Sequence, residues 1–284
     1  MKSILCSVLF VLVSVILATA QGTYTQIDYP GASATGCFGI NEAGETVGYY
    51  NDTSGKQHGF LLSAGVFTTI DSPGASGTVL DGLNNVGQVI GVTSSPSSAF
   101  VYDRQTQTFT PIAFKGTTLV IPSSISDSGI VAGWFDPPGN VEQAGFELIA
   151  GRRTLVNVPG ASSTVVSGRS TSGKLAGYYS SSNGTLNFIF ESGRYRQLEI
   201  PNAPLAEVFG INPAGTAVVG QYISQSLNVG FVYQSNTLQT LLFPGSIYTE
   251  AYGINTAGEV VGAFGDTFVQ HCFTWTPSAD AATK

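Results

Sequence analysis

One ten-residue segment recurs six times along this 284-residue chain, and it constrains the fold more than any other feature of the sequence. The first copy, residues 39–48, reads GINEAGETVG. The other copies are GLNNVGQVIG (82–91), SISDSGIVAG (124–133), GRSTSGKLAG (168–177), GINPAGTAVVG (210–220) and GINTAGEVVG (253–262). Successive copies begin 42 to 44 residues apart, which is the length of one four-stranded blade of a β-propeller.

Each repeat divides into the same four predicted strands. The first strand ends at an Asn-x-x-Gly turn or a Ser variant of it, and the second strand follows at once, as in Val47-Gly48-Tyr49-Tyr50. A third strand is centred on a phenylalanine in every repeat: Phe60, Phe100, Phe146, Phe188, Phe231 and Phe273. A short turn leads to the fourth strand, which several repeats end with Pro-Gly because proline cannot continue strand pairing.

The two ends of the chain are complementary in this repeat. The part of the chain after residue 20 opens with a fourth-type strand, residues 24–28, and closes on a third-type strand, residues 271–275, with no fourth strand after it. The N-terminal strand can therefore complete the last blade and remove the free sheet edge of an open array. We predict an all-β, six-bladed propeller closed in this way. A β-solenoid or a different number of blades is the alternative.

The N-terminal region predicts export. Lys2, an apolar run and Ala18-Thr19-Ala20 are typical of a signal peptide, so we expect residues 1–20 to be removed, residues 21–277 to form one propeller domain and residues 278–284 to be a short tail. The expected location is extracellular or periplasmic. With 11 basic and 18 acidic residues, the formal charge is −7, which argues against nucleic acid as a partner. We expect a monomer without a membrane span.

Two of the three cysteines, Cys37 and Cys272, lie outside the predicted signal peptide. They are close to opposite ends of the repeat array, so in an oxidising compartment they are a candidate disulfide. Two buried free thiols are the alternative, because both cysteines lie in apolar strands. The distance between their Cα atoms decides between the two.

The repeat resembles that of the bacterial extracellular HAF-repeat proteins, named for a His-Ala-Phe motif in the third strand. The matching segments are His58-Gly59-Phe60, Ser98-Ala99-Phe100 and His271-Cys272-Phe273, together with the Gly-Ile-Asn-x-x-Gly-x-Val-Gly signature. The similarity covers essentially the whole chain after residue 20. It implies no activity, cofactor or catalytic residue. We interpret His58 and His271 as structural residues that cap or pack a strand start.

Several chemistries lack the residues that they need. Residues 168–174 resemble the start of a phosphate-binding loop, but Leu175 stands where Ser or Thr is required, and no helix is predicted after it. The two histidines and two cysteines after residue 20 lack the spacing of a typical zinc site, and neither histidine lies near a nucleophile elbow. We therefore predict no metal, no cofactor and no catalytic residue. Carboxylate pairs from distant repeats remain open.

A ligand-binding surface is the remaining candidate for a functional site. Loops between the second and third strands are the most varied, and variable loops on a rigid scaffold often bind ligands. At their bases the second strands supply aromatic residues that could stack on sugars: Tyr50, Phe135, Tyr179, Tyr222 and Phe264. Packing between blades is the alternative for these rings. The sequence favours a non-enzymatic, secreted binding module or scaffold for a glycan or an extracellular protein. The alternatives are an extracellular hydrolase or lyase acting on a polysaccharide or other polymer, and a purely structural surface-layer protein.

Overall fold

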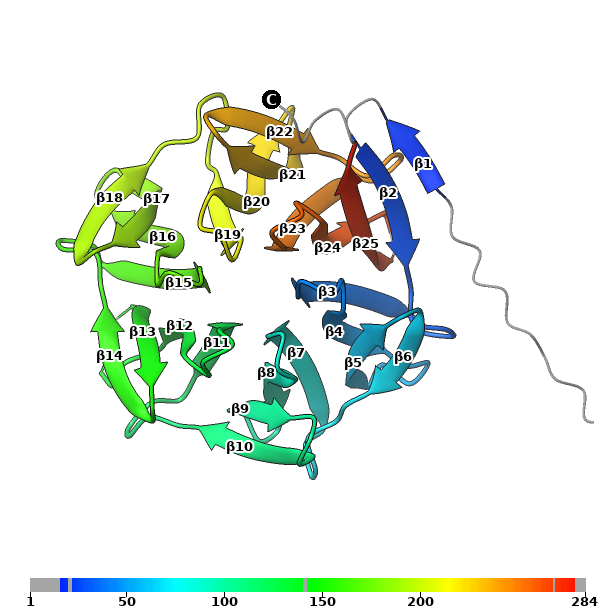
Figure 1. Ribbon diagram of the computed structural model, residues 1–284, viewed down its shortest axis with the longest axis horizontal. Coiled ribbons are helices and arrows are strands. Elements are labelled where there is room, and N and C mark those ends of the chain that lie inside the picture. Colours follow the sequence, from blue (N-terminus) through cyan, green and yellow to red (C-terminus); the bar gives the residue numbers. More distant parts are fainter. Residues whose placement is uncertain (1–15, 20–21, 140–141, 268, 279–284) are drawn as a thin grey trace, which may run out of the picture.

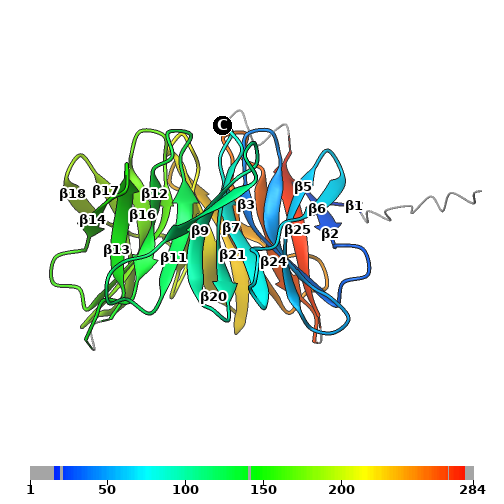
Figure 2. The ribbon, with the colours of Figure 1, turned by 90° about the horizontal axis from the view of Figure 1, so that it is seen from below.

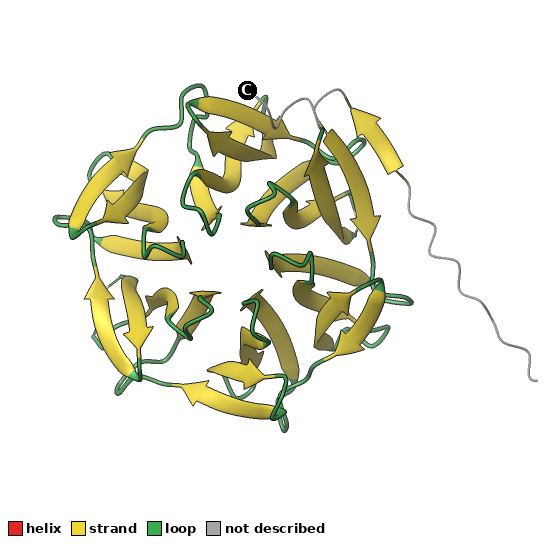
Figure 3. Cartoon of the chain, in the orientation of Figure 1, coloured by secondary structure: helices red, strands yellow, loops and turns green. Residues whose placement is uncertain are grey.

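The computed structural model describes residues 16–19, 22–139, 142–267 and 269–278. These residues form six antiparallel sheets arranged as blades around one axis, and they contain no helix (Figures 1 and 3). The innermost strands are β3 (Ala34–Ile40), β7 (Gly77–Leu83), β11 (Val120–Ile125), β15 (Ser163–Arg169), β19 (Glu207–Ile211) and β23 (Tyr248–Ile254). The predicted six-bladed propeller is confirmed.

The outer strands follow in chain order within each blade. The second strands are β4 (Thr46–Asn51), β8 (Gln88–Ser94), β12 (Val131–Phe135), β16 (Leu175–Ser181), β20 (Ala217–Ser224) and β24 (Val260–Gly265). The third strands are β5 (Gln57–Ser63), β9 (Ser98–Asp103), β13 (Ala144–Ile149), β17 (Gly184–Glu191), β21 (Leu227–Gln234) and β25 (Gln270–Pro277). The outermost strands are β6 (Val66–Thr69), β10 (Thr108–Ile112), β14 (Arg152–Val156), β18 (Arg194–Leu198), β22 (Thr237–Leu241) and β2 (Gly22–Ile27). Seen from the side, the ring is a short cylinder with loops at both ends (Figure 2).

The N-terminal strand closes the ring. β2 pairs antiparallel with β25, from Gly22 opposite Pro277 to Ile27 opposite Cys272, and thereby completes the blade made by β23, β24 and β25. This confirms the closure predicted from the phase of the repeat. A further strand, β1 (Ile16–Thr19), pairs with the outer edge of β2 (Figure 1). The predicted signal peptide includes β1, and its residues 1–15 and 20 lie outside the described residues, as do residues 279–284 of the predicted tail.

A disulfide crosses the seam between the last blade and the first. Cys37 on β3 and Cys272 on β25 are bonded, with their Cα atoms 5.3 Å apart, although 235 positions separate them in the sequence. Asn255 Nδ2 also donates to the Asn41 carbonyl across this seam, at 3.3 Å. Strand pairing, a covalent bond and a side-chain hydrogen bond therefore hold the two ends of the ring together.

The recurring residues of the repeat have structural roles. The six third-strand phenylalanines are almost completely buried between blades. Gly44 ends the first hairpin turn with φ +75°, a conformation that favours glycine. The two histidines bind aspartates at the ends of outermost strands, with His58 Nδ1 2.6 Å from Asp71 Oδ2 and His271 Nδ1 2.9 Å from Asp28 Oδ2. These contacts agree with the structural interpretation of both histidines.

All six innermost strands contain a β-bulge at the same repeat position. In β3, for example, the register shifts between Cys37 and Gly39, so that Phe38 has no partner on β4. The same shift occurs in the other five innermost strands. A bulge changes the direction of a side chain and increases the local twist. The repeat therefore places one irregular residue from every blade beside the axis.

Candidate functional site

Four of the five aromatic residues predicted to bind ligand are buried packing residues. Phe135 is 2% exposed and Tyr50 is 9% exposed, Tyr222 and Phe264 are also buried, and Tyr179 is half-buried. In three blades, an aromatic residue from the preceding connection covers the ring: Tyr29 stacks on Tyr50 at 3.6 Å, Phe243 stacks on Phe264 at 3.7 Å, and Phe114 meets Phe135 edge-on at 5.3 Å. These three rings are therefore covered, and Tyr222 is buried, whereas Tyr179 keeps part of its surface exposed. We place no sugar site on the four buried rings.

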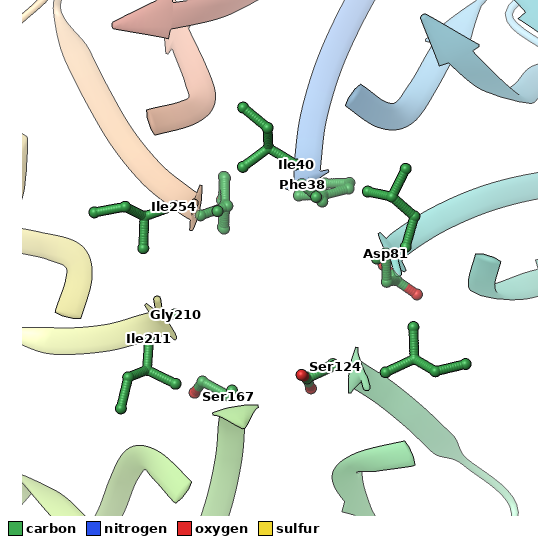
Figure 4. A pocket seen from close by; sticks show the side chains of 16 residues that line it. Phe38, Ile40, Asp81, Ser124, Ser167, Gly210, Ile211 and Ile254 are labelled. Atoms are coloured by element: carbon green, nitrogen blue, oxygen red, sulfur yellow. The ribbon is translucent and has the colours of Figure 1, made fainter. Parts of the chain in front are cut away.

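The six bulged residues form a layer around the axis. They are Phe38, Asp81, Ser123, Ser167, Phe209 and Tyr252. In contrast to the turns and strands around it, this position varies in chemical type from blade to blade. Five of these six residues also line a narrow cavity of about 80 Å³, shown in Figure 4. This layer was not predicted from the sequence, although each of its members directly precedes the first residue of the recurring segment.

Aromatic rings surround about half of the axis in a continuous series of contacts, which we call the aromatic arc. It runs through Tyr49, Phe38, Tyr252, Phe209 and Tyr178. The ring centroids of successive members are 5.8, 4.9, 5.2 and 6.5 Å apart. These residues come from the first, sixth, fifth and fourth blades, whereas Asp81 and Ser123 come from the second and third. Among the six bulged residues, the three aromatic ones thus lie on one side of the axis, and Asp81, Ser123 and Ser167 lie on the other.

A cavity of about 250 Å³ opens between the two sides, and we call it the axial pocket. Its lining is Phe38, Asp81, Ile121, Pro122, Ser123, Trp134, Val165, Ser167, Tyr178, Phe209 and Tyr252. Ile121 lies before the bulge on β11, near the end of the strand that follows the connection from the preceding blade. The axial pocket is therefore on the face of the ring that carries the connections between blades. Its volume is just below the usual range for small-molecule sites, which suits a small ligand. The axial pocket therefore combines aromatic walls with one carboxylate.

Asp81 is the one carboxylate among the described residues of this lining. Its Oδ2 atom is buried and accepts no hydrogen bond from the described residues. Burial raises the pKa of Asp81 from 3.8 to about 8, because the charged form loses its hydration and gains no partner. An uncompensated carboxyl group is costly to keep in a folded protein. Its presence beside a cavity therefore indicates a functional group.

Negative charge also lies close to the aromatic side. Tyr252 donates a hydrogen bond to Glu250 Oε2, and burial together with the Glu250 charge raises the pKa of Tyr252. Burial and the Glu207 charge similarly raise the pKa of Tyr178. Both tyrosines therefore stay neutral at physiological pH. No lysine, arginine or histidine occurs among the residues that line the axial pocket in the described part of the chain.

The proton chemistry of this pocket depends on Asp81. A carboxylic acid with a pKa near 8 could act as a general acid on a bound substrate. In the described structure, Asp81 Oδ2 has no protein group as a hydrogen-bond partner. Nor do the described residues bring three or more His, Cys, Asp or Glu side chains together in a way that could hold a metal ion.

Asp81→Asn is expected to stabilise the fold at high pH. The folded-state pKa of Asp81 is raised, so the protonated acid contributes stability that is complete below about pH 4 and is lost as pH rises towards 8. Asparagine does not ionise and avoids this loss. We expect a gain of about 1–3 kcal/mol in unfolding free energy at pH 9 and little change at pH 4. Urea denaturation at both pH values measures it. Equal effects at both would show that the Asp81 carboxyl ionises normally.

A larger groove of about 390 Å³ lies between the fourth and fifth blades, away from the axis. Lys174 and Gly215 both line this groove, and Lys174 Nζ donates to the Gly215 carbonyl at 3.0 Å. The Lys174 ammonium also pairs with Glu191 at 3.4 Å. The Lys174 ammonium therefore has partners within the protein. The other charged residues of the groove, Arg196 and Glu199, are exposed to solvent, in contrast to the buried Oδ2 atom of Asp81. We therefore take the axial pocket as the candidate site.

Comparisons with known proteins establish the fold. No family model matches the sequence, and no curated protein matches it. Among solved structures, the β-propeller domain of the trilobed protease from Pyrococcus furiosus is similar, with a TM-score of 0.56 and 10% identity, over 92% of this chain and 90% of that one. A streptogramin B lyase matches with a TM-score of 0.53 and 12% identity, over 91% and 98%. A nidogen/laminin complex matches with 0.51 and 14%, over 76% and 82%. The chain is thus a β-propeller, a class with many different functions.

The described part of the chain contains no helix that is long and apolar enough to cross a membrane.

Proposed function

We propose that this protein is a ligand-binding module and that its ligand occupies the axial pocket. The observation that carries the proposal is the buried Oδ2 atom of Asp81, which has no hydrogen-bond partner in the described structure and lies in a cavity with aromatic walls. A purely structural ring would gain stability by replacing Asp81 with a neutral residue, as the serines at the same position of the third and fourth blades illustrate. The acid at position 81 lowers the stability of the protein without ligand, and ligand binding offsets this loss.

The proposal includes export. The apolar N-terminal run of residues 4–17 supports a signal peptide, and the Cys37–Cys272 disulfide supports an oxidising compartment. The repeat signature supports membership of the extracellular HAF-repeat proteins. The mass of the exported protein tests this part of the proposal. A chain beginning at Gln21 supports it, and a chain that retains residues 1–20 contradicts it.

Trp134 provides a probe inside the pocket. The chain has two tryptophans, and Trp275 lies in the core of the last blade, so Trp275→Phe leaves Trp134 as the one emitting indole. We would titrate this variant with choline, 3,3-dimethylbutan-1-ol, glucose and N-acetylglucosamine. At least one compound is expected to change the Trp134 emission saturably. Calorimetry on the unaltered protein gives the same comparison without relying on the variant.

Ser123→Phe is the matched blocking variant. Phe38 and Phe209 occupy the equivalent bulge in other blades, so a phenylalanine ring fits this backbone and fills the pocket. We expect Ser123→Phe to fold normally and to lose the response to the compound that binds. An absence of any saturable response, or a response that Ser123→Phe leaves unchanged, would contradict the axial site.

A further inference from the structure

Resting on the binding function proposed above, we infer that the ligand of the axial pocket is an organic cation, either a quaternary ammonium group or a protonated amine. Three properties of the pocket support this class of ligand: its single carboxylate, its aromatic walls and the charges behind those walls.

The carboxylate lacks a counter-charge. Asp81 Oδ2 is buried without a hydrogen-bond donor in the described structure, and the lining contains no basic side chain. A cation that enters the pocket supplies the missing charge and allows Asp81 to ionise. An anionic ligand would meet Asp81 with no compensating group, so the pocket excludes it.

The aromatic walls match the same ligand. Phe38, Trp134, Tyr178, Phe209 and Tyr252 all line the cavity opposite or beside Asp81. Aromatic faces attract cations through their quadrupole, and cages of such rings are the common receptor for quaternary ammonium groups. Ring contacts between Phe38, Tyr252, Phe209 and Tyr178 hold these four side chains in place, which reduces the conformational entropy lost on binding.

Charges behind the arc reinforce the preference. Glu250 is hydrogen-bonded to Tyr252, and the Glu207 charge acts on Tyr178. Both carboxylates therefore lie next to pocket-lining rings, on the side of the axis away from Asp81. A metal ion would need several oxygen or nitrogen ligands, and the described residues do not bring three candidate ligands together. An organic cation needs negative charge nearby and contact with apolar or aromatic surfaces, and this pocket provides both.

Choline and 3,3-dimethylbutan-1-ol form the decisive pair of probes, because they have nearly the same shape and differ in charge. We expect calorimetry on the full chain above about pH 8 to show choline binding at least about tenfold more tightly than its neutral isostere. In Asp81→Asn, which is expected to fold at least as stably as the original chain, this preference should fall to about threefold or less.

Three outcomes separate the inference from the proposed function. A preference for choline that Asp81→Asn removes and Ser123→Phe abolishes supports both. Equal binding of the two probes, or tighter binding of glucose or N-acetylglucosamine with loss in Ser123→Phe, overturns the cation inference and retains the axial site. Choline binding that neither substitution changes places the ligand elsewhere and overturns both.

Discussion

Replacing Gly48 by alanine is expected to destabilise the ring by about 3 kcal/mol or more. A Cβ atom at Gly48 would lie 1.9 Å from the Gly36 carbonyl oxygen on the neighbouring strand. The bulge at Phe38 leaves β3 and β4 in this close approach, and the obstructing atom is backbone that cannot turn aside. The same contact occurs at all six equivalent glycines, at 1.9 to 2.2 Å, which explains why this glycine recurs in every repeat.

Gly230→Ala is the matched control for this prediction. Gly230 also lies within a strand, β21, but a Cβ atom there would have its nearest neighbours at 3.4 Å, an ordinary contact. We expect its unfolding free energy to change by less than about 1 kcal/mol. Urea denaturation of both variants measures the difference. Similar midpoints for Gly48→Ala and Gly230→Ala would show that the close approach at the bulge does not limit the fold.

Removing the seam disulfide is expected to have the second large effect. The bond closes a loop between residues 235 positions apart, so its loss should lower the unfolding free energy by about 2–5 kcal/mol. We expect the double variant Cys37→Ala, Cys272→Ala to remain folded, because β2 still pairs with β25 along its whole length. Thermal unfolding with and without a reducing agent measures the effect.

The double variant is also the control for reduction. A reducing agent should lower the unfolding midpoint of the original chain towards that of the double variant and leave the double variant unchanged. If reduction leaves the original chain unaffected, β-strand pairing alone determines the stability of the seam, and the disulfide contributes little.

The repeat pattern predicted the ring because its spacing and phase are properties of the chain itself. A strand at residues 24–28 without a first-type strand before it had to pair with the last blade, and β2 does so with a shift of one or two residues at its ends. The phenylalanine of each third strand was likewise visible as a recurring apolar position and is a core residue.

The binding site could not be predicted in the same way, because burial depends on neighbours. Tyr50 at the base of a varied loop has the composition of a ligand-binding residue, but Tyr29 from the preceding connection covers its ring. Conversely, Asp81 is a lone acidic residue in an apolar strand, and nothing in its local sequence shows that six bulges bring Phe38, Phe209 and Tyr252 round the same axis. Comparing the repeats at their one variable inner position would have indicated this layer.

The structure of the protein crystallised with choline above about pH 8 tests the central claim most directly, because Asp81 is expected to ionise there when the cation binds. The account predicts the trimethylammonium group in the axial pocket, beside the Asp81 carboxylate and within about 6 Å of aromatic ring centroids of the arc. Choline bound on the varied-loop surface with the axial pocket unchanged would contradict it.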